Sequence, residues 1–468
     1  MHSTSAQRAR VASLPVLVRS IRSSERWIYF FLAVQFGCQC ALMAEWLGGR
    51  WRLYFRAASF ASSLFMLFFI QGRPVQPHPA RLLGVSLLGL MGLGLLHSDS
   101  DTVAGIAHWV FNIAIWAPLF WVGRIALTGR TVWNLLMMLW GFNLVSSVVG
   151  VLQVYYPERF APSAEFVKSL LGIMADALLI ELADGRQVWR PFGLSDNPGG
   201  ASVAGSMTVI IGLAIFTMRA NRWLKALSLL GIATGVFCIY VCEIRSIMVT
   251  TVLGAGVMLV LQVLQGRTSR AFATTLIVPL VIVLGLSWTN ALSDNRVQQR
   301  VQSLGEASTT TVYYQNRGRF IEHSLLQELP QYPLGAGLGR YGMMAAYFSD
   351  PTNTRRTFLW AEVQLSAWLY DGGLLMIVLG YAAVVTACVS TYKIAVSRNL
   401  PPLLCECAGI ITALNAGWLA ITFTYVLFLS QAGLIFWLLN AAVFAAAAPL
   451  RLAAARRTYR RQPPLPTF

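Results

Sequence analysis

The sequence predicts an all-α polytopic membrane protein with about twelve transmembrane helices. Of its 468 residues, 56% are hydrophobic and only 12% are charged, whereas soluble domains carry about 25% charged residues. Apolar runs of roughly 20 residues, the length that crosses a bilayer, recur along the whole chain. The expected spans are 27–47, 57–72, 81–97, 103–123, 131–154, 200–218, 224–242, 246–265, 271–288, 366–391, 403–425 and 429–450.

Arginine and lysine in the short loops predict the orientation, because cytoplasmic loops are enriched in both. Alternate loops carry most of them, which places both termini in the cytoplasm. Arg50, Arg52 and Arg56 depart from this rule, since they fall in the first outer loop; an external anionic headgroup is one explanation for them. The residues that follow the rule are Arg73, Arg81, Arg124, Arg130, Arg219, Arg222, Lys225, Arg267, Arg270, Lys393, Arg398, Arg451, Arg456, Arg457, Arg460 and Arg461.

This topology leaves two long segments on the outer side, about 155–199 and 289–358. Both contain aromatic residues, proline and glycine, so we expect short helices that lie on the membrane surface. The expected parts of the chain are a basic cytoplasmic N-terminus (1–26), spans one to nine (27–288), a large outer loop (289–358), spans ten to twelve (359–450) and a basic cytoplasmic tail (451–468).

The net charge of +17 would suggest nucleic-acid binding in a soluble protein. No soluble basic domain is present to carry that function, whereas arginines that flank membrane helices face anionic headgroups. We therefore expect the lipid bilayer as a partner and no nucleic acid. The seven cysteines fall in or beside apolar runs. Cys405 and Cys407 lack a second pair at metal-ligand spacing, so we expect small buried hydrophobic residues.

A polar interval interrupts this apolar chain at 313–341. In a membrane protein such residues occur together where water or a polar ligand meets them. The interval contains Arg317, Arg319, Glu322, His323, Gly335, Gly337, Gly339 and Arg340.

Further arginines lie on the outer side beside apolar runs, among them Arg190 and Arg245. Arg245 alone could pair with Glu243 or extend outward to water. Arginines that converge from separate outer segments favour an anionic ligand at the outer leaflet instead. Because the planar guanidinium suits phosphate oxygens, a lipid-linked phosphate or pyrophosphate fits.

Four motifs, in order, resemble the O-antigen ligase and polymerase superfamily, and they cover about residues 185–385. The segment with His323-Ser324 before its glycine cluster is most similar to the ligases. The interval from Arg319 to Gly335 also matches a spacing of the polymerases, so both remain open. The motifs are Arg190-Pro-Phe-Gly-Leu-Ser-Asp-Asn-Pro-Gly-Gly-Ala, Glu243-Ile-Arg-Ser, Arg317 through His323 to Pro333-Leu-Gly-Ala-Gly-Leu-Gly-Arg-Tyr, and Leu369-Tyr-Asp-Gly-Gly-Leu-Leu.

The resemblance implies a GT-C-like membrane glycosyltransferase in the bacterial inner membrane, with its active site facing the periplasm. Such an enzyme moves a glycan from undecaprenyl pyrophosphate to an acceptor hydroxyl, which for a ligase belongs to lipid A–core. A polymerase and a protein O-oligosaccharyltransferase are the alternatives within this class. No cofactor is expected, because arginines would balance the charge of the leaving pyrophosphate. The candidates are Arg190, Arg245, Arg317, Arg319 and Arg340.

His323 is the candidate general base, because a histidine can accept a proton near neutral pH. Of the five histidines, it is the one expected beside the arginines; the alternative is a surface histidine that caps a short helix. Glu322 and Asp371 are the candidate acids to orient it, and the sequence does not choose between them. The loop glycines either let a ligand approach the backbone or form a tight connector with positive φ: Gly335, Gly337 and Gly339.

Asp99-Ser100-Asp101 resembles the metal-binding Asp-x-Asp of other glycosyltransferases, but no supporting ligand lies nearby in the sequence. A helix N-cap before the fourth span explains these residues better, so we predict no catalytic metal. The alternative outside the enzyme class is a transporter of lipid-linked glycans. That function would call for polar residues inside the spans and broken helices in paired positions; the spans carry little charge, which disfavours it.

Overall fold

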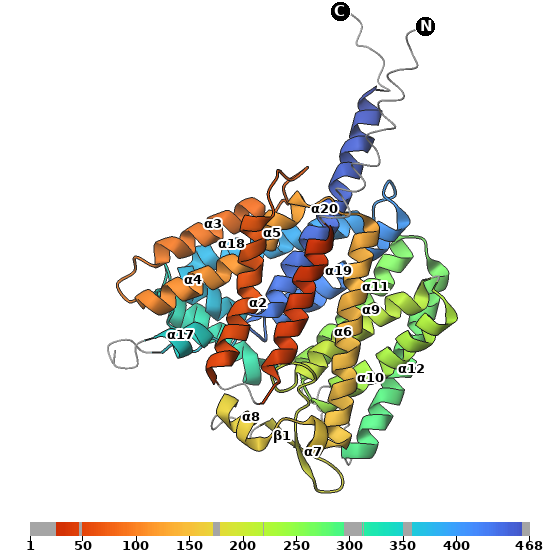
Figure 1. Cartoon of the computed structure of the whole chain (residues 1–468), viewed down its shortest axis with the longest axis horizontal. Helices are drawn as coiled ribbons and strands as arrows, with labels where there is room; N and C mark the ends of the chain where they lie inside the picture. The colour runs from red at the N-terminus through yellow and green to blue at the C-terminus, as the bar shows by residue number, and fades with distance from the viewer. Residues whose placement is uncertain are drawn as a thin grey trace, which may run out of the picture.

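The computed structural model describes residues 25–45, 49–171, 178–218, 220–293, 311, 313–349 and 358–460. Long α-helices dominate this part of the chain (Figure 1). Its two strands, β1 (Leu179–Glu181) and β2 (Gln187–Trp189), form an antiparallel hairpin. The expected N-terminal region before 25, much of the expected outer loop and the end of the tail lie outside the described residues.

Each expected span overlaps a helix. Among the described residues, eight helices are long and apolar enough to cross a membrane, or up to nine if the pair α4 and α5–η1, bent by 43°, forms one span. The chain is therefore an all-α polytopic membrane protein. In order, the helices that overlap the expected spans are 25–42, α2 (Gly49–Phe69), α3 (Arg81–Gly94), α4 (Thr102–Trp116), α5 (Pro118–Trp121), η1 (Val122–Arg124), α6 (Gly129–Tyr155), α9 (Gly200–Thr217), α10 (Arg222–Val241), α11 (Arg245–Leu264), α12 (Thr268–Ser293), α18 (Gln364–Ala395), α19 (Pro402–Ile421) and α20 (Gln431–Arg460).

The number twelve stays a prediction, because some of these helices are short or interrupted by charge. α3 has 14 residues, about 21 Å of helix at 1.5 Å per residue, less than the roughly 30 Å of a hydrocarbon core. α2 carries Arg52 and Arg56 in its first turns, which lowers its apolar content.

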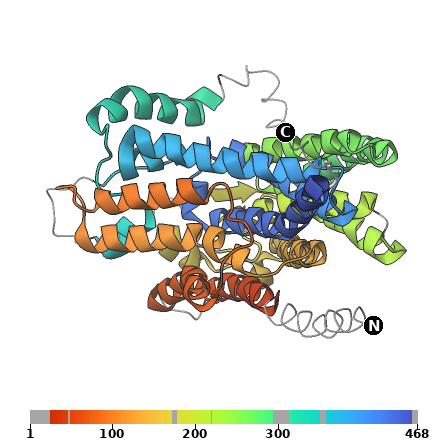
Figure 2. The same cartoon turned by 90° about the horizontal axis from the view of Figure 1, so that it is seen from above.

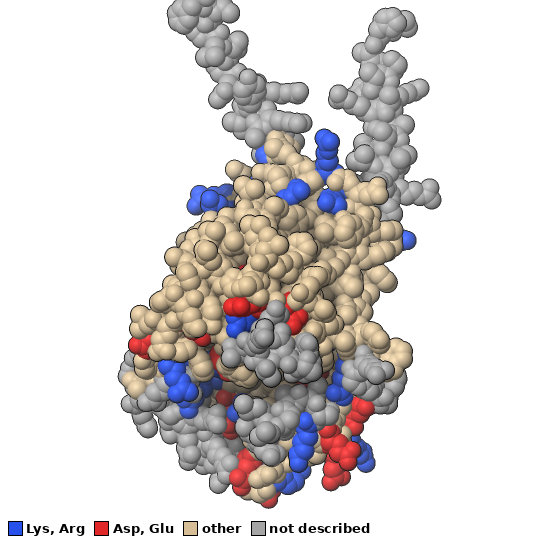
Figure 3. Space-filling view, turned by 90° about the vertical axis from the view of Figure 1, so that its left-hand side faces the viewer, with Lys and Arg blue, Asp and Glu red and all other residues tan. Residues whose placement is uncertain are grey.

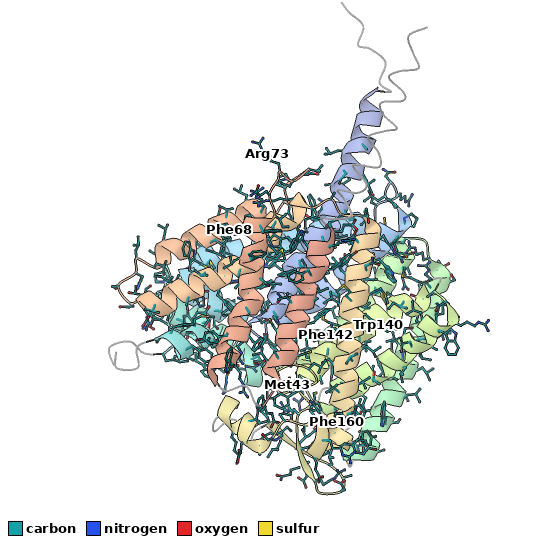
Figure 4. All side chains as sticks on the ribbon, in the orientation of Figure 1. Met43, Phe68, Arg73, Trp140, Phe142 and Phe160 are labelled. Carbon is teal, nitrogen blue, oxygen red and sulfur yellow. The ribbon has the colours of Figure 1, made fainter. Side chains whose placement is uncertain are left out.

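The bundle has two ends of different composition. Thr131, at the start of α6, donates a hydrogen bond to Glu25 (2.7 Å); we call this the terminal end and the opposite one the distal end. Figure 4 labels Arg73 toward the terminal end, and Met43 and Phe160 toward the distal end. Figure 3 shows basic side chains at the terminal end, a broad uncharged area, and mixed acidic and basic side chains at the distal end. A membrane belt between two aqueous ends requires this pattern.

Small and amide side chains bring the central helices together. A Cβ atom on Gly205 of α9 would lie 2.5 Å from the Gly235 carbonyl oxygen of α10, so glycine permits this close approach. In α20, the Asn440 amide exchanges hydrogen bonds of 2.8 and 3.0 Å with Asn415 of α19 and accepts one of 2.6 Å from Thr391 of α18. These contacts fix the frame that carries the distal segments.

The described parts of both long segments between helices lie toward the distal end (Figure 1). The first contains α7 (Pro157–Phe160), α8 (Ala164–Leu171), the β1–β2 hairpin and the 190–199 loop. The second contains a helix followed by a glycine-containing loop and α17 (Gly342–Phe348). That helix, here the 314–331 helix, lies alongside α18 (Figure 2). Its successive turns are η4 (Tyr314–Gly318), α15 (Arg319–His323), η5 (Ser324–Glu328) and α16 (Leu329–Gln331).

Candidate active site

The 314–331 helix presents His323 at the surface of the distal end. Two π-helical turns, η4 and η5, flank the turn that carries it, and π turns occur frequently at functional sites. The Tyr313 hydroxyl donates a hydrogen bond to the Phe423 carbonyl (3.1 Å), which attaches the start of this helix to the end of α19. About half of the His323 side chain is exposed (51%), so its imidazole is open to a substrate.

Glu328 lies beside His323 and is held from two sides. Its Oε1 is 3.6 Å from His323 Nε2, longer than a direct hydrogen bond. The Ser324 hydroxyl donates to Glu328 Oε2 (2.7 Å), and the Tyr370 hydroxyl of α18 donates to Oε1. Ser324 is itself 2.7 Å from the Ser366 hydroxyl of α18. A fixed carboxylate next to an exposed imidazole is the arrangement that orients a general base.

The structure places neither acid expected to orient His323 in that position. Glu322 accepts a hydrogen bond from the Tyr314 hydroxyl, and this bond raises the pKa of Tyr314. Asp371 faces His108 and Tyr341 instead. Glu328 follows His323 by five residues, a spacing that an α-helix does not bring to one face. The π turn at η5, with its i→i+5 hydrogen bonding, brings the two together.

A second group is buried between α4 and α18. His108 Nε2 lies 3.1 Å from Asp371 Oδ1, and both side chains are almost fully buried. The Tyr341 hydroxyl donates to Asp371 Oδ2 (2.8 Å). Burial, followed by the nearby Asp371 carboxylate, raises the pKa of Tyr341 well above its ordinary value. His108 falls in the expected span 103–123, and no role was predicted for it, because a sequence pattern within one helix does not show which other helix packs against it.

The three loop glycines form a tight connector. All have positive φ (101°, 89° and 78°). A Cβ atom on Gly339 would lie 2.4 Å from the Gly105 nitrogen of α4. The same loop joins α18 where that helix bends at Gly373 (φ 65°): the Ala336 N–H donates to the Tyr370 carbonyl (2.8 Å). The glycines that take part are Gly335, Gly337 and Gly339.

Arg340 and the acidic residues of the α3–α4 connection stabilise this loop. The buried Arg340 guanidinium donates to the Ala336 carbonyl (2.8 Å) and lies 3.7 Å from Asp99. Asp101 caps α4 by accepting from the Ala104 N–H (2.9 Å), as expected for these residues. Among the described residues, no group of three or more His, Cys, Asp or Glu side chains has the arrangement to hold a metal ion.

The remaining arginines of the 314–331 helix differ in their surroundings. Arg317 forms an ion pair with Glu362, just before α18. Burial lowers the pKa of Arg317 from its ordinary value. Arg319 is exposed, with its guanidinium 5.5 Å from the Phe320 ring centroid. Of this pair, Arg319 is therefore the more accessible to an anionic ligand.

Arg190 and Arg245 lie on two segments that touch each other. Cys242, at the turn between α10 and α11, has its sulfur 3.8 Å from the Pro191 carbonyl oxygen. Gln153 of α6 fixes the 190–199 loop by accepting from the Phe192 N–H (2.8 Å). The two arginines expected to hold pyrophosphate thus come from neighbouring, well-anchored backbone.

Arg56 explains part of the apparent conflict with the charge rule. It forms an ion pair with Asp196 of the 190–199 loop, and its Nη1 donates to the Tyr347 hydroxyl (3.1 Å) and contacts the Met343 sulfur (3.3 Å) of α17. Arg52 lies 3.8 Å from the centroid of the Phe166 ring. Arg56 therefore joins α2, the 190–199 loop and α17, a role that no local sequence pattern indicates.

The 314–331 helix carries His323 with its carboxylate and the exposed Arg319, the 190–199 loop carries Arg190, and the turn between α10 and α11 carries Arg245. This set has the components for accepting a proton from a hydroxyl and for binding a phosphate-containing leaving group. Comparison of the chain with models of protein families gave no match, and comparison with curated proteins gave none either.

Proposed function

We propose that this chain is a glycosyltransferase of the O-antigen ligase type. It transfers a glycan from undecaprenyl pyrophosphate to a hydroxyl of lipid A–core, at the periplasmic face of the bacterial inner membrane. The observation that carries the proposal is the exposed His323 with Glu328 held against it by Tyr370 and Ser324. The resemblance of the four motifs supplies the substrate class.

In this proposal each group has a defined task. His323 accepts the proton of the acceptor hydroxyl as that oxygen attacks the anomeric carbon. The bond from the anomeric carbon to the pyrophosphate oxygen breaks, and the pyrophosphate leaves with that electron pair. Arg190, Arg245 and Arg319 stabilise its negative charge through charge-assisted hydrogen bonds. Glu328 keeps the imidazole in position and stabilises it once it is protonated.

Purified protein in proteoliposomes, supplied with carrier-linked glycan and lipid A–core, tests the activity. We expect a covalent glycan–lipid A–core product and release of the undecaprenyl pyrophosphate. Carrier-linked glycan of increased length, without transfer to lipid A–core, would assign a polymerase. Transfer to a protein hydroxyl would assign an oligosaccharyltransferase.

One observation favours a transporter as the second candidate. The buried His108–Asp371 pair puts ionisable groups inside the helix bundle, and such groups often mark transport pathways. The same proteoliposomes separate the two functions. Movement of carrier-linked glycan across the bilayer without formation of a new glycosidic bond would identify the transporter and reject the transferase.

A further inference from the structure

His108, Asp371 and Tyr341 form a buried polar cluster that the proposed reaction does not use directly. An ionisable pair in the interior of a membrane protein is costly unless its members satisfy each other. Here Asp371 faces His108 Nε2 at 3.1 Å and accepts from the Tyr341 hydroxyl at 2.8 Å. Hydrophobic residues of similar volume would fill the same space at lower electrostatic cost, so the cluster calls for a role beyond packing.

The cluster connects three segments that are far apart in the sequence. His108 comes from α4, Asp371 from the distal half of α18, and Tyr341 from the end of the glycine loop. The Tyr341 hydroxyl also lies 3.2 Å from the Ala367 carbonyl oxygen, one turn before Asp371. The His108 and Tyr341 rings are in edge contact, with centroids 5.2 Å apart. Together these contacts fix the distal half of α18 against α4.

The residue next to Asp371 leads from this cluster to the candidate base. Tyr370 donates its hydroxyl to Glu328, the carboxylate beside His323. Its carbonyl accepts from the Ala336 N–H (2.8 Å), and its ring lies 5.7 Å from the Tyr341 ring. α18 bends directly after this pair, at Gly372 and Gly373. The orientation of Tyr370 thus depends on where Asp371 is held.

We infer that His108, Asp371 and Tyr341 are positioning residues for His323. They fix the bend of α18, which places the Tyr370 hydroxyl against Glu328 and so holds the carboxylate beside the imidazole. The inference rests on the proposed function, since it assigns the cluster to the same transfer reaction. The cluster binds no substrate; it acts through Tyr370 and Glu328.

The test is a double-mutant cycle on purified protein in proteoliposomes, with kcat and KM measured for carrier-linked glycan. His108→Ala and Tyr341→Phe should each lower kcat about ten-fold, the effect of losing one close contact to a charged group, and leave KM unchanged. His108→Gln, which keeps an N–H donor, should restore most of the rate. In a Glu328→Gln background, His108→Ala should change kcat by less than about two-fold, because the two residues act along one path.

Asn415→Ala is the matched control, because it breaks a buried polar contact with Asn440 that includes neither Tyr370 nor Glu328. In the double variant Asn415→Ala with Glu328→Gln, the fold-losses of kcat caused by the two single substitutions should multiply. If the fold-losses of kcat caused by His108→Ala and Glu328→Gln also multiply in their double variant, the inference is overturned. A wild-type kcat in Tyr341→Phe would overturn it as well. If His108→Ala does not fold, the kcat values of Tyr341→Phe and His108→Gln test the inference by themselves. Absence of any transfer by the wild-type protein would instead reject the proposed function.

Discussion

Glu328 owes its proposed role to its place in a π turn. It lies five positions after His323, and the η5 turn brings its Oε1 to 3.6 Å from His323 Nε2. Ser324 and Tyr370 then hold both carboxylate oxygens. Because both carboxylate oxygens accept hydrogen bonds, the Glu328 side chain has little freedom to move away from the imidazole. A group that orients a general base must be fixed in this way.

Glu328→Gln should therefore lower the rate of transfer about ten- to hundred-fold, since it removes the charge that stabilises the protonated imidazole. Glu322→Gln provides the comparison, because that carboxylate is bonded to Tyr314 instead. Initial rates of both variants, measured at equal concentrations of folded protein, check the prediction. A larger loss in Glu322→Gln than in Glu328→Gln would contradict the assignment of the orienting acid.

The candidate arginines should fall into two classes, those whose loss lowers transfer and those whose loss lowers the amount of folded protein. Arg190→Ala, Arg245→Ala and Arg319→Ala should lower transfer about ten- to hundred-fold, the effect of losing a charge-assisted contact of about 1.5–3 kcal/mol. Lysine should rescue only partly, because a point charge does not replace a planar fork. Activity at matched expression measures the effect; near-wild-type transfer in all three alanine variants would put the pyrophosphate site elsewhere.

Arg340 belongs to the other class. Its buried guanidinium holds the Ala336 carbonyl and lies near Asp99, so Arg340→Ala should reduce the amount of folded protein more than the activity per folded molecule. Gel filtration in detergent together with specific activity distinguishes the two effects. Full abundance with lost transfer would return Arg340 to the substrate site.

At the level of elements, the glycine loop packs tightly against the backbone of α4. Gly339 combines positive φ with a Cβ position 2.4 Å from the Gly105 nitrogen, whereas Gly185 has positive φ (81°) in open space. Gly185→Ala should therefore cost about 1–3 kcal/mol of backbone strain, and Gly339→Ala should cost more because a backbone atom must also move. Thermal unfolding in detergent measures the difference, and equal unfolding temperatures would show that the clash is relieved locally.

The elements themselves were largely predictable, because crossing a bilayer imposes a length and an apolar composition that the sequence displays. The N-cap at Asp101 was predictable for a similar reason, since its side chain acts within one turn of α4. The side chains that contact Glu328, Asp371 and Arg56 could not be predicted from the sequence. The contact of Glu328 with His323 depends on a π turn, which has no signature in the amino-acid composition. The hydrogen bonds of Glu328 with Tyr370, of Asp371 with Tyr341 and of Arg56 with Asp196 join residues at least 30 positions apart in the sequence.

The whole molecule has opposite ends of different charge character, and the proposal needs the distal end outside. Cysteine introduced at the exposed Asp184, in the β1–β2 hairpin, should react with a membrane-impermeant thiol reagent in cells with a permeabilised outer membrane. Cysteine at the exposed Trp223, at the start of α10, should react only after lysis of the inner membrane. The parent chain with its seven native cysteines is the control. The reverse labelling pattern would overturn the orientation.

The central claim is that His323 accepts the proton of the acceptor hydroxyl. The direct measurement is the rate of glycan transfer by purified wild-type, His323→Ala and His323→Gln proteins in proteoliposomes at equal concentrations. Because a general base contributes about 10²–10⁴-fold, His323→Ala should bind carrier-linked glycan normally yet transfer it at least about a hundred-fold more slowly. His323→Gln, which cannot accept the proton, should be equally slow. Substantial turnover by His323→Ala would contradict the claim, and an active His323→Gln would reduce the imidazole to a positioning group.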